Sequence, residues 1–148
     1  MAREYTADAL GSLAENVVGE LQELLVKRVR IGTMFAMGEM LAEAPVADPT
    51  TWRRPRPHIG GRFRASILPW EGEMPETVPP SDAAGYPVPD ASDVLAVMEN
   101  LEPGGKAGLV SNVEYAERLA DGWSRQANAG WVDRIVVRTE DAMREVTL

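Results

Sequence analysis

The sequence predicts an α+β fold in which a long N-terminal helix packs on a small mixed or antiparallel sheet with one or two further helices. Three observations predict it: a proline-free amphipathic stretch, two short segments with strand character, and two later segments with helical character. At 148 residues, the chain is expected to form a single domain, residues 1–148. Its 45% apolar and 26% charged residues are typical of a folded globular protein.

The first expected element is a helix over residues 6–43. Apolar residues recur there at three- and four-residue steps, namely Leu10, Leu13, Val17, Leu21, Leu24, Ile31, Met34, Phe35 and Leu41. Such a helix is roughly 50 Å long, more than a compact domain of this size needs, although Gly32 or Gly38 could bend or divide it. Two interpretations stay open: the helix only packs in the core, or it also packs on a neighbouring subunit.

A loop is expected over residues 44–61, because its prolines and the Gly60-Gly61 pair oppose regular structure. Its end overlaps a basic cluster of twelve residues that contains His58 and five arginines: Arg53, Arg54, Arg56, Arg62 and Arg64. Guanidinium groups pair with phosphates, which makes this cluster the best candidate for nucleic-acid binding. Pairing with an acidic surface of an adjacent subunit is the competing interpretation, and we favour it.

A half-buried strand is expected from Arg62, because Phe63, Ala65 and Ile67 alternate with polar residues; Pro69 should end it or place it at an edge. A proline-rich acidic loop follows over residues 71–90, whose composition predicts mobility. Residues 65–105 hold no Lys or Arg and eight acids: Glu71, Glu73, Glu76, Asp82, Asp90, Asp93, Glu99 and Glu102. The other 15 of the 23 acids match the 15 basic residues, so the net charge of -8 lies in this segment.

Three further elements are expected. A short helix should begin at Asp90 or Ser92, which can cap it, and run to Leu101 before a Pro-Gly-Gly turn. Residues 107–113 have strand character, and the turn before them would place this strand antiparallel to a neighbour or directly after the helix. A helix is expected after Gly130, although its β-branched residues also favour a strand.

The residues needed for catalysis or metal binding are scarce. The chain has no cysteine, and His58 has no nucleophile or orienting acid near it in sequence. Gly104-Gly105-Lys106 lacks the hydroxyl residue and the earlier glycine of a phosphate-binding loop. The acid pairs match no metal-binding loop. We therefore expect a protein that is not an enzyme and has no cofactor or metal.

No run approaches the roughly 18 to 20 consecutive apolar residues that span a bilayer, and the first residues are charged, without an apolar signal core after them. We therefore expect no membrane partner. We expect a soluble product that is made in the host cytoplasm.

Residues 111–130 carry the most specific motif. Tyr115 and Leu119 stand four apart on a helical turn that Asp121-Gly122 can end, and Ser124, Gln126 and Asn128 can hold the loop that follows. The segment resembles the neck or tail-completion proteins of long-tailed double-stranded DNA phages through Asn112, Tyr115, Ala116, Leu119, Gly122, Ser124, Gln126, Ala127 and Gly130. A weaker likeness covers Pro45-Val46 and residues 61–66, with residues 47–60 inserted and Asn128 in place of a common proline.

The resemblance implies a structural virion protein that forms a ring at the head–tail junction, with six copies expected. Its partners would be further copies, the other neck or connector proteins and the tail-tube or tail-terminator proteins. Genomic DNA would pass through the channel without sequence-specific binding. A head-to-tail ring needs two complementary patches per subunit. The hypothesised interface residues are Arg53, Arg54, Arg56, Arg62, Arg64, Glu71, Glu73, Glu76 and Asp82.

Two alternatives remain at this point. The acidic residues could instead face the channel and repel DNA phosphates. The alternative function is a nucleic-acid-binding module that uses the arginine loop, residues 53–64. The motif residues themselves are interpreted mainly as scaffold.

Overall fold

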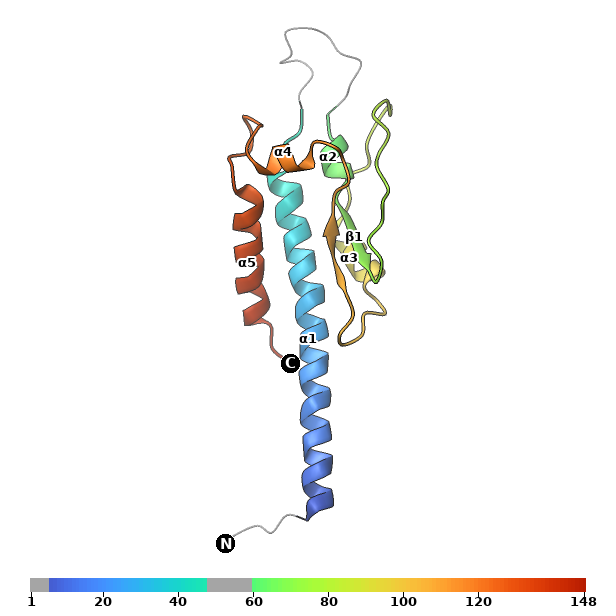
Figure 1. Ribbon diagram of the computed structural model, residues 1–148, viewed down its shortest axis with the longest axis vertical. Helices are drawn as coiled ribbons and strands as arrows, with labels where there is room; N and C mark the ends of the chain where they lie inside the picture. The colour runs from blue at the N-terminus through green and yellow to red at the C-terminus, as the bar shows by residue number, and fades with distance from the viewer. Residues whose placement is uncertain (1–5, 48–59) are drawn as a thin grey trace.

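The N-terminal helix is a single element in the computed structural model, which describes residues 6–47 and 60–148. Helix α1 spans Ala7–Glu43, and neither Gly32 nor Gly38 interrupts it (Figure 1). The side chain of Thr6 begins the helix by accepting the N–H of Ala9 at 3.2 Å. The long helix predicted from the sequence is confirmed.

The sheet has two antiparallel strands, β1 (Leu68–Glu71) and β2 (Ala107–Val110). Leu68 pairs with Val110, and Glu71 pairs with Ala107. The strand expected over residues 107–113 is therefore present, though shorter. Pro69 lies inside β1, where a proline is tolerated because β1 is an edge strand.

The strand predicted from Arg62 is wrong. Residues Arg62–Ala65 form a short helix, α2, and β1 begins only at Leu68. The buried residues of this stretch are Phe63, Ser66 and Ile67. Ser66 and Ile67 follow Phe63 by three and four residues, which fits one face of a helical turn. The spacing of Phe63 and Ile67 fits an alternating strand equally well. Six residues are too few to distinguish the two periods.

Three further helices occur in the described part of the chain. Helix α3 (Ala91–Val97) begins with a capping box, in which Asp90 accepts the Ser92 N–H at 2.8 Å and Asp93 accepts the Asp90 N–H at 2.9 Å. Helix α4 (Ala116–Ala120) is the predicted turn around Leu119, and α5 (Trp131–Glu145) is the predicted C-terminal helix.

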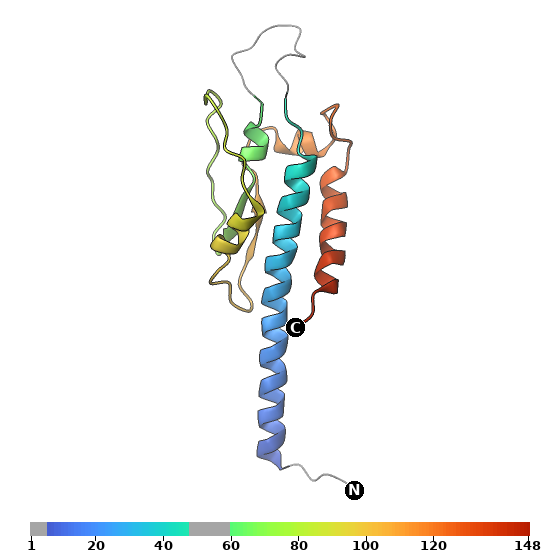
Figure 2. The same ribbon diagram turned by 180° about the vertical axis from the view of Figure 1, so that it is seen from behind.

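The core lies around the C-terminal half of α1. Helix α5 covers one flank of α1, and the sheet with α3 covers the other (Figures 1 and 2). The fully buried side chains come from α1, α3, α5 and the segments next to α2 and α3: Met37, Ser66, Ile67, Val94, Met98, Trp131 and Ile135. The α+β class predicted from the sequence is confirmed, and the N-terminal half of α1 extends out of this body.

Candidate subunit interface

The N-terminal half of α1, residues 7–25, is here called the stalk. Figures 1 and 2 both show that it runs beyond every other element of the body. Leu24 is half-buried, whereas six other large apolar side chains of the stalk are between 47% and 58% exposed: Leu10, Leu13, Val17, Val18, Leu21 and Leu25. A soluble subunit rarely leaves so long an apolar row in water, because burying it would be favourable.

The exposed row continues the face of α1 that packs on α5. Leu21, Leu25, Arg28 and Gly32 follow at steps of four, three and four, so they lie on one side of the helix. Arg28 Nε donates to the carbonyl of Val146 at 3.1 Å, beyond the end of α5. Gly32 also faces α5, because an added Cβ would lie 2.4 Å from Met143 Cγ. On the N-terminal side of Arg28, this face of α1 is left exposed by the described residues, as Leu21 and Leu25 show.

The charges of the stalk lie mainly on its other side. The stalk contains Asp8, Glu15, Glu20 and Glu23 and no Lys or Arg. At about 100° per residue, Asp8, Glu15 and Glu23 lie away from the leucine row, and Glu20 borders it. The stalk is therefore an amphipathic helix with an acidic face and an uncovered apolar face.

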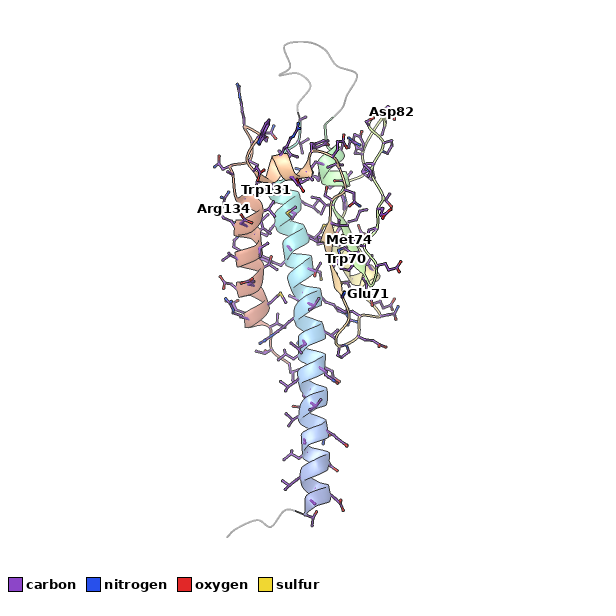
Figure 3. The ribbon with its side chains drawn as sticks, in the orientation of Figure 1. Trp70, Glu71, Met74, Asp82, Trp131 and Arg134 are labelled. Carbon is purple, nitrogen blue, oxygen red and sulfur yellow. The ribbon has the colours of Figure 1, made fainter. Side chains whose placement is uncertain are left out.

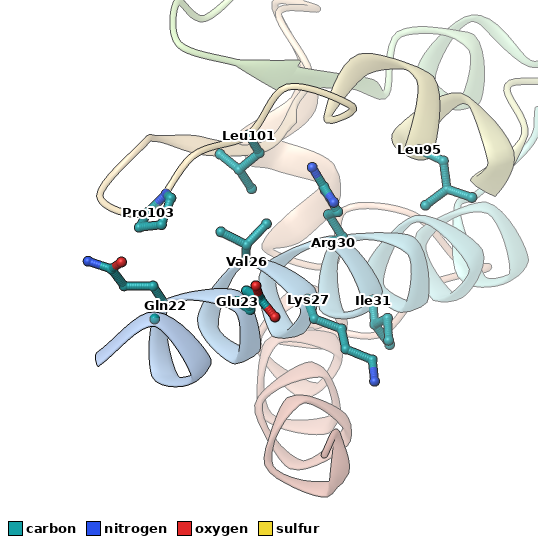
Figure 4. Close-up of a pocket in the computed structure, with 10 residues that line it drawn as sticks. Gln22, Glu23, Val26, Lys27, Arg30, Ile31, Leu95, Leu101 and Pro103 are labelled. Atoms are coloured by element: carbon teal, nitrogen blue, oxygen red, sulfur yellow. The ribbon is translucent and has the colours of Figure 1, made fainter. Parts of the chain in front are cut away.

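A hollow of about 590 Å³ lies where the stalk leaves the body (Figure 4). Gln22, Glu23 and Val26 line it from α1, and Leu95, Leu101 and Pro103 line it from α3 and the turn after it. Arg30 fixes the α3 side, because its Nε donates to the Met98 carbonyl at 2.8 Å and its Nη2 to the Glu99 carbonyl at 2.7 Å. The hollow shows that the stalk and the body do not close tightly on each other.

The acidic loop lies beside the sheet, on the flank of α1 opposite α5, with Glu71 at its base and Asp82 at its tip (Figure 3). Residues 72–90 have no regular secondary structure, as the sequence predicts, and Glu71 is the last residue of β1. The sequence did not reveal its anchors. Asn112 Nδ2 donates to the Pro75 carbonyl at 2.5 Å, and Arg62 Nε donates to the Pro79 carbonyl at 2.8 Å. A motif residue therefore holds the loop against the sheet.

Arg62 also forms an ion pair within its own chain. Its Nη1 lies 2.8 Å from Glu114 Oε1, and its Cζ lies 5.8 Å from the centroid of the Tyr115 ring. The hydrogen bond from Arg62 lowers the pKa of Glu114, and burial raises the pKa of Tyr115. The Arg62 side chain is only 16% exposed, so this member of the predicted interface stabilises the body.

The turn after α4 is shaped by Gly122 and closed by Gln126. Gly122 has φ +83°, and an added Cβ would lie 2.4 Å from the backbone N of Ala129. The Gln126 side chain bonds both backbone groups of Val46, and the Gln126 N–H donates to Ser124 Oγ at 3.1 Å. The predicted holding roles of Ser124 and Gln126 agree with these contacts, whereas Asn128 contacts the described residues through its backbone carbonyl, which accepts the Trp131 N–H at 3.2 Å.

The remaining motif residues join this turn to the core. Trp131 is 1% exposed, and its Nε1 donates to the Leu119 carbonyl at 2.9 Å. Its ring meets the Phe63 ring edge to face, with centroids 6.1 Å apart. Ala127 is buried, Ala116 packs against the core, and Gly130, with φ +74°, precedes α5. Each motif residue thus has a structural role.

The hypothesised interface residues that the structure describes differ in exposure. Arg53, Arg54 and Arg56 lie outside the described residues, as does His58 of the basic cluster. Glu73, Glu76 and Asp82 are exposed on the acidic loop, whereas Glu71 and Arg64 are half-buried. The sequence reasoning missed Arg118 and Trp123, which are both exposed and stack with Arg118 Cζ 5.5 Å from the ring centroid of Trp123. The available signal in the sequence was an arginine five residues before a tryptophan, with a helix end between the two residues.

Within residues 6–47 and 60–148, no three His, Cys, Asp or Glu side chains are grouped so that they could hold a metal ion. In the same part of the chain, no helix is long and apolar enough to cross a membrane. No family model, curated protein or solved structure matches the chain.

Proposed function

We propose that this protein is a structural virion subunit that forms a ring at the head–tail junction of a long-tailed phage. The ring would act as a neck, tail-completion or terminator component, link the portal-side connector to the tail tube and surround the DNA channel. Further copies of this chain and the adjacent neck and tail proteins are the proposed partners.

The stalk carries this proposal. Its uncovered apolar face continues the face on which α5 packs, so it is suited to receive another helix. The small residue Ala14 lies on this face and Gly11 borders it, and a Cβ added at Gly11 would meet nothing within 4 Å. We therefore propose that neighbouring copies cover the apolar face of the stalk in the ring.

The acidic face of the stalk supports a channel role. A ring that buries the leucine row leaves Asp8, Glu15 and Glu23 facing away from the contact. Carboxylates along a channel repel phosphates, which lets DNA slide without adhering to the wall. The resemblance of residues 112–130 to phage neck proteins supports the head–tail junction as the place of this ring.

The nucleic-acid-binding alternative has less support in the described residues. Of the two described arginines of the basic cluster, Arg62 is paired with Glu114 and bonded to the acidic loop. The neighbouring loop carries only acidic charge, which disfavours phosphate binding. Retention on DNA that weakens steeply with salt would support this alternative.

Mass photometry and negative-stain microscopy of the purified protein test the proposal. We expect oligomers of one defined mass and rings with a central opening. A protein that stays monomeric at every concentration, alone and with the other neck proteins of its phage, would exclude the ring.

Variants of the stalk test whether the ring depends on the exposed apolar face of the stalk. Leu13→Asp with Leu21→Asp places charges in the apolar row and should leave monomers with an intact body. Ser12→Asp with Asn16→Asp adds the same two charges to the polar side of the same helix and should assemble like the wild type. Circular dichroism checks that each variant is folded.

A further inference from the structure

Two exposed surfaces lie on opposite flanks of α1. One is the turn between α4 and α5, residues 121–130, which rises beside the top of α5; the other is the acidic loop beside the sheet (Figures 1 and 2). In a cyclic ring, each subunit presents one flank to the next copy and the other flank to the previous copy. These two surfaces are therefore placed to meet between neighbours.

The first surface carries an exposed tryptophan and the arginines Arg118, from the end of α4, and Arg125, beside the single acid Asp121. Trp123 is 75% exposed, and Arg118 stacks over its ring at 5.5 Å. Arg125 is exposed in the same turn. Among the described residues, neither Arg118 nor Arg125 forms an ion pair. Tryptophan and arginine are the residues most enriched at the energetic centres of protein interfaces, so this cluster has the composition of a contact site.

The second surface is acidic and apolar. Glu73, Glu76 and Asp82 are exposed on the loop, and no Lys or Arg occurs in residues 65–105. Exposed apolar side chains lie between these acids and after them: Met74 at 56%, Val78 at 39% and Val88 at 65%. Asn112 and Arg62 hold the loop at its carbonyls, so its side chains are presented on a supported backbone. The surface complements an aromatic ring flanked by cations in both charge and polarity.

We propose that the Trp123 turn of one copy docks on the acidic loop of the next copy. Trp123 would lie on the apolar side chains of the loop, with Arg118 and Arg125 opposite its carboxylates. This contact rests on the proposed ring, and it names the lateral interface of that ring. It assigns the basic partner to Arg118 and Arg125 in place of Arg62, which is engaged within its own chain.

A charge-swap experiment tests the pairing. The two variants are named after the surface that is changed. The basic variant replaces the bases of the first surface, Arg118→Glu and Arg125→Glu. The acidic variant replaces the acids of the loop, Glu73→Arg and Glu76→Arg. Each alone brings like charges face to face, so we expect the dissociation constant to rise roughly 100-fold. An equimolar mixture should restore assembly, because opposite charges then face each other at every contact of an alternating ring. Mass photometry measures both effects.

Matched controls separate the pairing from a change in net charge. Glu99→Arg with Glu102→Arg alters the charge equally, but these residues lie after α3 and not on the loop, so this variant should assemble like the wild type. Trp123→Ala should weaken assembly, and the acidic variant should not rescue it.

The outcomes separate this contact from the ring itself. If both charge variants still form rings like those of the wild type, the proposed contact is overturned and the proposed ring is not. Variants that dissociate but are not restored by mixing would also overturn the pairing. A wild-type protein that never assembles would overturn the ring and this contact together.

Discussion

The side-chain amide of Gln126 binds both backbone groups of Val46. Its Oε1 accepts the Val46 N–H and its Nε2 donates to the Val46 carbonyl, each at 2.9 Å. This contact ties the turn before α5 to the segment that follows α1. Only an amide side chain offers a donor and an acceptor at this spacing, which explains a glutamine at this position.

Gln126→Ala should lower the free energy of unfolding by roughly 1 kcal/mol, because both hydrogen bonds are lost. Gln126→Glu keeps the size of the side chain but not the donor, so it should be no more stable than the alanine variant. Urea unfolding followed by circular dichroism measures the change. Gln22→Ala, at an exposed amide on the stalk, should stay within about 0.5 kcal/mol of the wild type. Equal effects at both glutamines would contradict the assigned role.

Gly122→Ala should destabilise the protein far more than Gly104→Ala. Both glycines have nearly the same positive φ, +83° and +82°, so both variants carry a left-handed penalty of about 1–2 kcal/mol. A Cβ at Gly104 meets nothing within 4 Å, whereas at Gly122 it would lie 2.4 Å from the Ala129 backbone. Thermal unfolding compares the two. A difference close to zero would show that residues 122 and 129 can separate without cost.

The same substitution at two tryptophans should separate stability from assembly. Trp131→Phe removes the donor to Leu119 from a buried site, so the unfolding free energy should fall by roughly 1–3 kcal/mol. Trp123→Phe changes an exposed ring and should leave the stability of the body unchanged while weakening the oligomer. Chemical unfolding and mass photometry on the same samples measure both. Loss of stability at Trp123 would contradict its assignment to a contact surface.

The ion pair between Arg62 and Glu114 should stabilise the fold only where Glu114 is ionised. The pKa of Glu114 is lowered from its ordinary value of 4.5, first by the hydrogen bond from Arg62. A lowered pKa in the folded state means that the stabilisation is complete above pH 4.5 and disappears as the pH falls through the folded-state pKa. Glu114→Gln should therefore be less stable than the wild type at pH 7, and the difference should shrink below pH 4.5. A difference independent of pH would exclude this pair as its source.

Local signals in the sequence were enough to predict most elements. Thr6 and Asp90 cap the helices that follow them, and Gly122 ends a helical turn, because capping depends only on nearby residues. The strand predicted from Arg62 was wrong because it also rested on local signals alone. The short apolar pattern of this stretch fits both a helix and a strand. Phe63 of this stretch is buried against Trp131, and no local pattern in the sequence indicates that contact.

The candidate interface was predicted only in part, because it depends on contacts between distant residues. The charge imbalance identified the acidic loop, yet nothing near Asn112 in sequence indicates that it bonds to Pro75. The density of arginines along the chain points to Arg62, which is paired with Glu114, and not to Arg118, which is exposed beside Trp123. Only the structure distinguishes an arginine already paired within the chain from one that is exposed.

The uncovered stalk should also determine how assembly begins. A helical segment of this length without tertiary contacts is marginally stable in water, so the stalk of a lone subunit should fray. Hydrogen exchange should then be fast at its amides and slow in the rest of α1. The first pair of subunits has to order two stalks at once, whereas each later subunit joins one that is already ordered. Ring formation should therefore be nucleated, with a lag and a sharp threshold in protein concentration, and free subunits should accumulate until that threshold is crossed.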